Sequence, residues 1–410
     1  MAENDNLNVI IPISRYVSTL VILSSLSMME QCHGQWWFPT TPATPPSPSP
    51  TTSTLTNSST AGSSSPAWTG FPTTPATGTP PSPPTTPTTT CTTLVVMPSS
   101  SSGFGLQTFY TSLQSAIDAV PENNTGQVTI EILPGTYTEK VSIPASKPFI
   151  TLQGAGRALT IITYNDTANS TGSTVKSATF SIFAANFTAR NITFQNSAPY
   201  AIAGQTGAQA VALLVWGDMA AFYGCGFVSS QDTICDQNGR HYFRDCYVEG
   251  NIDIIWGNGQ SLYEYCEIQS TADNNSGCIT AQGRASDDET TGFAFVGGSI
   301  TGTGYNLLGR AYGLYSRVVF INTYMENIIN PAGWDDWPTS DFAKLNSTST
   351  RRLLATSTQR HYFYGEYGNT GPGANLTYRV SWMKNLTSAD AANFSSLSFI
   401  DGTLWLTSET

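Results

Sequence analysis

The sequence contains few basic residues and very little histidine. Lys and Arg number 17 against 28 Asp and Glu, which gives a formal net charge of −11. Nucleic acids and anionic membranes are bound by basic surfaces, so neither is expected as a partner. Beyond residue 34 the only histidines are His241 and His361, and no cysteine spacing is typical of a zinc site. We therefore expect no metal ion.

The chain also lacks an apolar run long enough to cross a bilayer comfortably. The best candidate extends from Tyr16 to Met29 behind Arg15 and is followed by the small residue Gly34. This pattern predicts a secretory signal peptide over residues 1–34, with a signal anchor as the alternative because Glu3 and Asp5 are acidic.

Apolar residues are scarce in the next segment as well. Residues 35–90 consist almost wholly of Thr, Ser, Pro and Ala, a composition that cannot bury enough apolar surface to fold. We expect an O-glycosylated linker here, followed by one single-core domain over residues 91–410. Asn-x-Ser/Thr sequons recur along the chain and fit passage through a secretory pathway to the extracellular space or a cell wall.

Cysteine is limited to seven residues, of which six remain if the signal peptide is removed. An even number suits an oxidising compartment. We predict a disulfide between Cys266 and Cys278, because the short Ser270–Gly277 loop would let neighbouring turns of the chain meet. Cys225 and Cys246 could instead stack as buried thiols on successive turns.

An aromatic residue recurs three positions before a cysteine. The pairs, at spacings of 21 and 20 residues, are Phe222 and Cys225, Phe243 and Cys246, and Tyr263 and Cys266. A period of this size is typical of a solenoid, in which each turn buries its apolar side chains against its neighbours. The segments are short and rich in Val, Ile, Phe and Tyr, so we expect strands. The alternative is an antiparallel sandwich with accidental spacing.

Asp232 and Asp253 each follow a cysteine of this repeat by seven residues. The shared register places them on adjacent turns of the coil, where parallel strands lie about 4.8 Å apart. Two acids this close perturb each other's pKa and can divide the roles of acid and nucleophile. Asp273 follows Cys266 by the same interval, so spacing alone does not identify a catalytic acid.

Several motifs occur in one order along residues 92–407. They are the segments Gly135–Glu139, Gln209–Leu213, Ser230–Gly257, Leu308–Tyr312, Pro331–Trp334, Tyr364–Gly371 and Phe399–Trp405. In these segments the chain resembles the pectin methylesterases, also called pectinesterases. The resemblance implies a right-handed parallel β-helix that hydrolyses the methyl esters of polygalacturonate without a metal or another cofactor.

The resemblance also implies a role for each matching residue. Asp253 would be the nucleophile on the ester carbonyl, and Asp232 the general acid and then the base. Gln209 and Gln231 would line the oxyanion site, and Arg310 would hold Asp253. These roles suit the chemistry, because an ester needs a nucleophile, a proton for the departing methoxide and donors for the developing oxyanion.

Three aromatic residues fall where the resemblance implies contact with sugar rings, namely Trp256, Tyr312 and Trp334. Three of the matching positions differ from the family pattern. Tyr312 stands where Trp is usual, Ala311 where Pro is usual, and Cys235 where an aromatic residue is common. These differences bear on substrate contact and leave the acid pair intact.

The leading hypothesis is a secreted, monomeric enzyme that removes methyl esters from pectin, with a proteinaceous inhibitor as a possible partner. One alternative is another β-helix enzyme, either a pectate lyase or a polygalacturonase, although neither fits the pattern of Gln209, Gln231 and Arg310. The second alternative is a non-catalytic wall-binding protein on the same fold.

Overall fold

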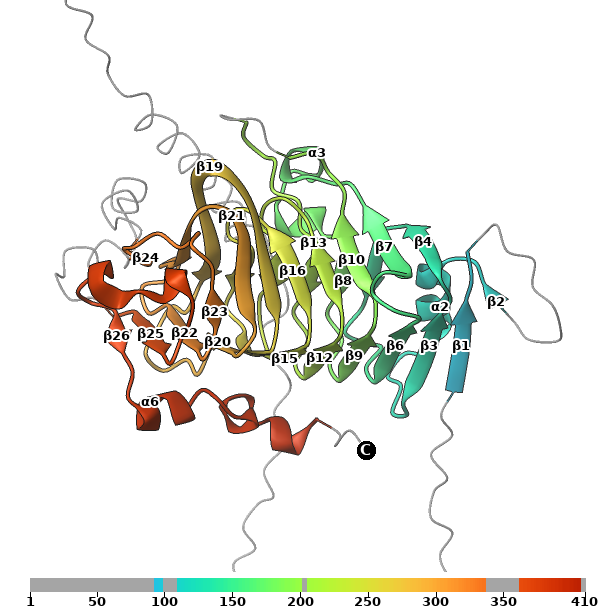
Figure 1. Ribbon diagram of the computed structural model, residues 1–410. Coiled ribbons are helices and arrows are strands. Elements are labelled where there is room, and N and C mark those ends of the chain that lie inside the picture. Colours follow the sequence, from blue (N-terminus) through green and yellow to red (C-terminus); the bar gives the residue numbers. More distant parts are fainter. Residues whose placement is uncertain (1–91, 99–108, 201–204, 337–360, 407–410) are drawn as a thin grey trace, which may run out of the picture. The chain divides into compact units, whose positions relative to one another are not determined.

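The computed structural model describes residues 92–98, 109–200, 205–336 and 361–406. The predicted signal peptide and the predicted linker both lie outside the described residues. Within the described part, short strands wind in parallel into a coil (Figure 1).

One turn of the coil illustrates the repeat. β12 (Ala220–Tyr223), β13 (Gly226–Val228) and β14 (Ile234–Asp236) follow one another, and the next strand, β15 (Arg240–Arg244), lies parallel to β12. Each strand therefore pairs with its counterpart one turn away. The predicted fold, a right-handed parallel β-helix, is confirmed, and the antiparallel sandwich is wrong.

The strands form two hydrogen-bonded sheets. The first has 12 strands and contains, in spatial order, β2 (Phe109–Tyr110), β1 (Thr92–Val96), β3 (Val128–Ile132), β6 (Ile150–Gly154), β9 (Phe187–Arg190), β12, β15, β18 (Gln260–Glu264), β20 (Gly292–Val296), β22 (Arg317–Ile321), β25 (Phe363–Tyr367) and β26 (Lys384–Asn385).

The second sheet has 14 strands and covers two faces of the coil, which the long strand β19 (Glu267–Gln282) joins. One face contains β4 (Gly135–Thr138), β7 (Thr160–Tyr164), β10 (Thr193–Asn196), β13 and β16 (Tyr247–Gly250). The other contains β5 (Val141–Ile143), β8 (Phe180–Ile182), β11 (Leu213–Val215), β14 and β17 (Ile255–Gly257). β21 (Ser299–Arg310) pairs with β19, β23 (Tyr324–Met325) and β24 (Trp334–Asp335).

Stacked side chains hold successive turns together. Five rings of the first sheet lie face to face at centroid distances of 4.6, 4.4, 4.7 and 4.4 Å, in the order Phe222, Phe243, Tyr263, Phe295 and Phe320. Phe222, Phe243 and Tyr263 are the aromatic positions of the sequence repeat, and all five rings are buried. The period in the sequence thus corresponds to one turn of core packing.

A column of left-handed residues turns the chain out of the first sheet. It runs through Asn191, Gly224, Asp245, Tyr265, Gly297, Asn322 and Gly368, all with φ between 52° and 67°. Each of these residues directly follows the last residue of a strand in the first sheet, and the strands pair in register from one turn to the next. Glycine, asparagine and aspartate tolerate this conformation best, which explains six of the seven residues in this column, with Tyr265 as the exception.

The helices of the described residues lie outside the coil. The α-helices described are α2 (Leu113–Ala119), α3 (Ala168–Thr171) and α6 (Ser388–Ala392), and the 3₁₀ helices are η1 (Val175–Ser177), η2 (Pro372–Ala374), η3 (Leu376–Tyr378), η4 (Leu397–Ile400) and η5 (Gly402–Leu404). α2 lies at the β1 end of the coil in Figure 1 and buries Leu113, Ala116 and Ile117.

Glu139 ties α2 to the coil. Its carboxylate accepts hydrogen bonds from the main-chain N–H groups of Leu113 and Gln114 at 2.8 and 3.1 Å and from the Ser112 hydroxyl at 2.8 Å. At the other end of the helix, Lys147 Nζ donates to the carbonyl oxygens of Ile117 and Asp118 at 3.0 and 2.7 Å. Glu139, which ends the first of the matching segments, Gly135–Glu139, therefore serves the fold.

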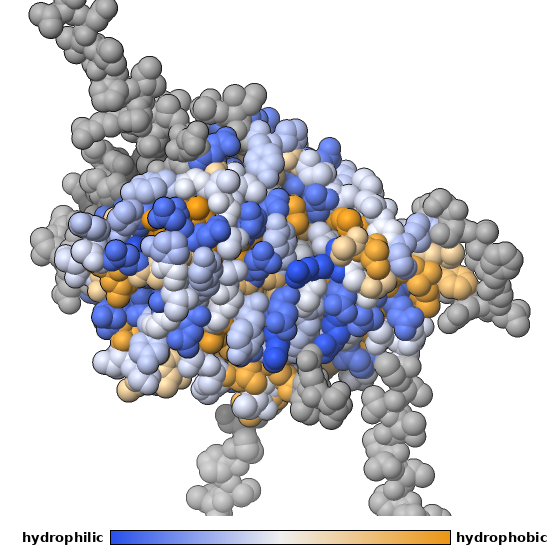
Figure 2. Space-filling model, in the orientation of Figure 1, coloured by the Kyte–Doolittle hydropathy of each residue, from blue (hydrophilic) through white to orange (hydrophobic). Residues whose placement is uncertain are grey.

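The face of the molecule seen in Figure 2 is mostly hydrophilic, with small separate hydrophobic spots. In the described ranges, no helix is both long enough and apolar enough to span a membrane.

Candidate active site

The polar residues predicted to carry the chemistry gather where the chain enters the face formed by β11, β14 and β17. Gln209 precedes β11, Gln231 and Asp232 precede β14, and Asp253 precedes β17. A parallel bridge joins Gln231 to Ile252, and the Asp232 N–H donates to the Ile252 carbonyl at 3.0 Å. The two aspartates therefore occupy the same position on adjacent turns, as the shared spacing predicted.

Both aspartates adopt the left-handed backbone conformation, with φ of 63° at Asp232 and 49° at Asp253. Aspartate accepts this region better than most residues, but it is uncommon away from turns and special sites. Two equivalent residues in the same rare conformation show that the backbone makes the same turn at both positions, and such conformations often occur at functional sites.

Arg310 forms two hydrogen bonds with the carboxylate of Asp253. It ends β21, and its Nε donates to Asp253 Oδ1 at 2.7 Å while its Nη2 donates to Asp253 Oδ2. The two parallel bonds form a bidentate fork, the geometry in which an arginine orients a carboxylate best. Both side chains are buried. Burial lowers the pKa of Arg310, but the charge of Asp253 and its hydrogen bonds outweigh this effect, so the pKa is raised. The pair is thus a fixed, charged unit.

Asp232 lies beside this unit and has a different electrostatic environment. Burial and, next, the Asp253 charge raise the pKa of Asp232 well above its ordinary value, while Arg310 and a hydrogen bond from Gln231 oppose the shift. Its Oδ1 is buried and has no hydrogen-bond partner. Asp232 therefore favours the neutral acid next to an ionised neighbour, and it presents an unpaired oxygen to the site.

A second column of polar residues flanks the aspartates. Gln209 Oε1, Ser230 Oγ and Asn251 Oδ1 are buried and have no hydrogen-bond partner. The Asn251 N–H donates to the Ser230 carbonyl at 2.7 Å, so these residues lie on adjacent turns. Buried polar groups nearly always form a hydrogen bond, so unpaired ones indicate a place where a ligand or a water molecule binds. The sequence reasoning missed Ser230 and Asn251, although they follow Gln209 at intervals of 21 residues.

Two of the three predicted aromatic residues lie next to the acid pair. Trp256 is buried, and its Nε1 donates to the Asp232 carbonyl at 3.2 Å. The partly exposed Tyr312 packs against the same outward-facing apolar cluster, which includes Cys235. Trp256 thus fixes the main chain of Asp232, and Tyr312 offers a ring at the surface.

The prediction that Trp334 contacts a sugar ring is wrong for this structure. Its side chain is only 2% exposed and lies inside the coil, stacked on Tyr364 with ring centroids 4.5 Å apart. Its Nε1 donates to Glu366 Oε1 at 3.1 Å, and Glu366 forms a buried ion pair with Arg379. The alternation of a strand points Trp334 inward while its neighbour Asp335 points outward, a choice that the motif did not reveal.

The predicted disulfide between Cys266 and Cys278 is also absent, since both are free thiols. Cys266 precedes β19 and contacts the Phe243 and Glu264 carbonyls at 3.6 Å, whereas Cys278 lies near the far end of that long strand. Cys266 continues the column of Cys225 and Cys246, because the strands that follow the three cysteines pair in register. Thiol stacking, expected for Cys225 and Cys246, thus extends to a third turn.

Cys278 lies instead beside the acid pair. Thr280 pairs with Ile255, so Cys278 lies level with Asp253 on the next turn. Burial, followed by the Asp253 charge, raises the pKa of the Cys278 thiol well above its ordinary value. Among the described residues, no group of three or more His, Cys, Asp and Glu side chains is arranged to hold a metal ion.

Comparisons with known proteins agree on one family. A family model described as Pectinesterase matches residues 102–403. "Probable pectinesterase 8" of Arabidopsis thaliana is 45% identical over 304 residues, covering 72% of this chain and 73% of the relative. "Putative pectinesterase 14" of the same plant is 42% identical over 313 residues, covering 76% of this chain and 88% of the relative.

Solved structures give the same result. The structure titled "Pectin methylesterase from Carrot" is 33% identical, with a TM-score of 0.65, and covers 76% of this chain and 94% of that chain. A deglycosylated pectin methylesterase from Aspergillus niger is 26% identical, with a TM-score of 0.61, and covers 78% of this chain and 96% of that chain.

Proposed function

The chain belongs to the pectinesterase family, and on that premise we propose that it hydrolyses the methyl esters of pectin, releasing methanol and leaving pectate. The observation that carries the proposal is the pair of aspartates with opposite electrostatic settings. Asp253 is held as a carboxylate by the Arg310 fork, and Asp232 favours the neutral acid. An ester hydrolase needs such a division of roles.

In the first half of the reaction, the Asp253 carboxylate attacks the carbonyl carbon of a methyl ester. The bond to the methoxy oxygen breaks, and Asp232 donates its proton to that oxygen, so that methanol leaves. The product of this half-reaction is an acid anhydride between the uronate and Asp253. The side-chain amides of Gln209 and Gln231 stabilise the oxyanion that develops during the attack.

In the second half, Asp232 is a carboxylate and serves as the base. It takes a proton from a water molecule, whose oxygen attacks the uronate carbonyl of the anhydride. Asp253 leaves as a carboxylate, Asp232 is again an acid, and the product releases its proton to solvent as pectate. Arg310 restrains Asp253 in both halves. Tyr312 and the apolar cluster around Trp256 form the floor on which the sugar rings rest.

The cellular context is part of the same proposal. Residues 1–34 direct secretion, residues 35–90 form a glycosylated linker, and residues 91–410 act as a monomer on pectin in a cell wall. A proteinaceous inhibitor is a candidate partner. The sequence composition of the first 90 residues and the substrate named for the relatives support this context.

The direct test measures methanol release from esterified pectin together with the absorbance of unsaturated products. We expect methanol without a rise in absorbance, and we expect Asp253→Asn to reduce methanol release at least a hundredfold while the protein remains folded, because an amide cannot replace the charged nucleophile. A rise in absorbance would indicate a lyase. Purified wild-type protein that releases no methanol would refute the proposal.

A further inference from the structure

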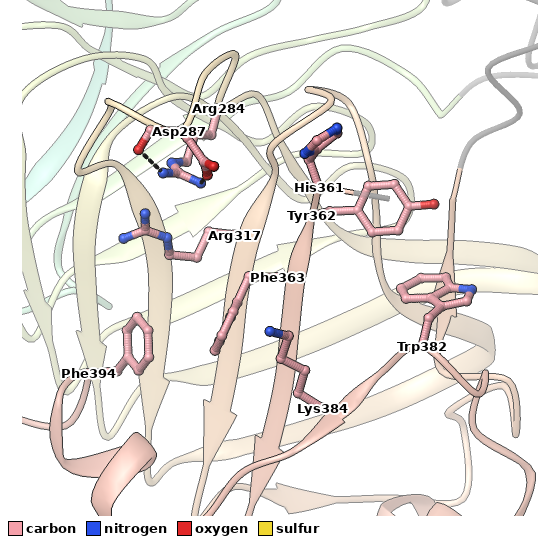
Figure 3. Close-up of a pocket in the computed structure, with 9 residues that line it drawn as sticks. All are labelled: Arg284, Asp287, Arg317, His361, Tyr362, Phe363, Trp382, Lys384 and Phe394. Carbon is pink, nitrogen blue, oxygen red and sulfur yellow. Dashed lines mark hydrogen bonds and ion pairs between the residues drawn. The ribbon is translucent and has the colours of Figure 1, made fainter. Parts of the chain in front are cut away.

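A second concave site lies away from the two aspartates. It is a cavity of about 500 Å³ at the starts of β22 and β25 and beside β26 (Figure 3). This volume is typical of small-molecule sites. Arg310 ends β21 and Arg317 begins the next strand, β22, so residues 311–316 connect the arginine that holds Asp253 to this cavity.

The lining of the cavity is strongly basic in an acidic protein. Three cationic side chains, those of Arg284, Arg317 and Lys384, face one carboxylate, Asp287. That carboxylate compensates Arg284 poorly, because the two charged groups are 3.6 Å apart and the Asp287 side chain is 80% exposed. The chain as a whole carries a net charge of −11, so the basic lining of the cavity is opposite in sign to the net charge of the protein.

Arg284 is buried and fully engaged by the main chain. Its guanidinium donates to the carbonyl oxygens of Glu289, Tyr315 and Asp287 at 2.8, 3.2 and 2.6 Å. Neutral carbonyls orient the cation without cancelling its charge. Arg284 is therefore a fixed source of positive potential behind the cavity.

Arg317 is the least compensated cation of the three. Its guanidinium donates only to the Thr290 and Glu289 carbonyls, each at 3.3 Å, and it has no ion pair with any described residue. Burial, followed by the Arg284 charge, lowers the pKa of Arg317 to about 10. An anion placed next to Arg317 would relieve both effects.

The rest of the lining suits a sugar. Lys384 Nζ lies 4.4 Å from the centroid of the Phe363 ring, and Figure 3 shows the charged ends of Lys384 and Arg317 directed to the same side of the strands. Trp382 and Phe394 add flat apolar surfaces. Asp390 lies near Lys384 but is fully exposed and is held by Thr387.

We infer that this cavity is a binding site for the carboxylate of an unesterified uronate, and thus holds the de-esterified stretch of the polymer. Two guanidinium groups and an ammonium supply the charge, and the rings supply the apolar surface. The inference rests on the proposed function for the identity of the ligand. It means that the enzyme retains its own anionic product although its overall charge is negative.

The test is binding of an unesterified oligogalacturonate of defined length, measured by calorimetry at low ionic strength on the full chain. Lys384→Glu inverts an exposed charge, and Arg317→Gln removes the uncompensated one. We expect the double variant to bind the oligomer at least tenfold more weakly, and Lys384→Glu alone about threefold more weakly. If the double variant does not fold, the affinity of the Lys384→Glu variant alone tests the inference.

Arg157→Gln is the matched control, because it removes one exposed positive charge near Tyr247. Its affinity should stay within twofold of the wild type. The inference is overturned if the pocket variants bind as tightly as the wild type, if a neutral galactose oligomer of equal length binds as well, or if inorganic phosphate competes equally at the same concentration.

Methanol release from a short, fully esterified substrate separates this inference from the proposed function. The pocket variants should release methanol at the wild-type rate, because the cavity holds no member of the acid pair. A protein that releases no methanol and still shows binding that depends on Lys384 and Arg317 refutes the proposed function and supports the cavity as a uronate site.

Discussion

At the scale of single residues, the buried Asp232 lowers the free energy of unfolding when it would otherwise be ionised. Its raised pKa means that the neutral form is preferred in the folded protein, so the folded state loses stability as pH rises through that pKa. Below about pH 4, where an Asp in the unfolded chain is also protonated, this loss vanishes. The acid that the reaction needs therefore lowers the stability of the folded protein at neutral pH.

Asp232→Asn should consequently stabilise the protein while abolishing turnover. We expect the gain in the free energy of unfolding to be near zero below about pH 4 and to grow as pH rises, because ionisation of this Asp then favours the unfolded wild-type chain, whereas Asn cannot ionise. Denaturant unfolding at several pH values measures it. An equal effect at all pH values would mean that folding does not shift the pKa of Asp232.

Arg310 should matter for stability and for catalysis together. Arg310→Ala leaves the Asp253 carboxylate buried without a partner, which costs about 3–5 kcal/mol in the free energy of unfolding. Arg310→Lys keeps the charge but loses the fork, so it should cost less stability and still lower turnover at least tenfold. Urea unfolding and methanol release check both. A stable, active Arg310→Ala protein would show that the fork is dispensable.

The residues that could be predicted from the sequence are those tied to the repeat. Asp232, Asp253 and Gln231 lie at the same edge of adjacent turns because their spacing equals one period. Trp334 could not be placed, since a motif does not say whether a strand residue points into the coil or out of it. Ser230 and Asn251 were within reach, because the period that links Gln209 to them is visible in the sequence.

At the scale of elements, the left-handed column decides where each turn ends. Gly224 has φ of 59°, and a Cβ at this position would lie 2.8 Å from Asn191 Oδ1. Asparagine already occupies the equivalent positions 191 and 322. The column thus combines a conformational demand with close packing between neighbouring turns.

Gly224→Ala should therefore lower the free energy of unfolding by about 1–2 kcal/mol for the conformation, with a further loss from crowding. Gly172→Ala separates the two effects, because Gly172 has φ of 73° and no atom within 4 Å of an added Cβ. It should show the conformational cost alone. Thermal or urea unfolding provides the comparison, and equal losses in the two variants would remove crowding from the explanation.

The disulfide prediction failed at this scale. Between Cys266 and Cys278 the sequence predicts a short loop, whereas the chain continues as one long strand, β19, that bridges two faces of the coil. Its pairing with β21 includes a register shift between Thr271 and Ser276. Such an irregular insertion departs from the period, so the repeat carried no information about where Cys278 would lie.

At the scale of the whole molecule, stability is transmitted along the coil from turn to turn. Phe243 is fully buried between the stacked rings of Phe222 and Tyr263 and meets Phe227 edge to face at 5.7 Å. In a solenoid each turn contacts only its neighbours, so a defect in the middle weakens both halves.

Phe243→Ala should cost about 3–5 kcal/mol in the free energy of unfolding, from the lost burial and the cavity that remains. Tyr378→Ala is the control, because that ring is 72% exposed and its removal should change stability by no more than about 0.5 kcal/mol. Chemical unfolding followed by circular dichroism measures both. If Phe243→Ala lowers the free energy of unfolding by much less than this, the neighbouring rings must move to fill the cavity.

The hydrogen bonds of Glu139 and Lys147 to α2 bear on how separate molecules associate at high concentration. A parallel coil that ends bluntly exposes a rung of unpaired backbone groups, onto which the rung of another molecule can dock. Repetition of that event would produce a fibre. Glu139 and Lys147 hold α2 against β1, β2 and β5, so we expect loss of these contacts to expose the first turns and to increase end-to-end association of the molecules.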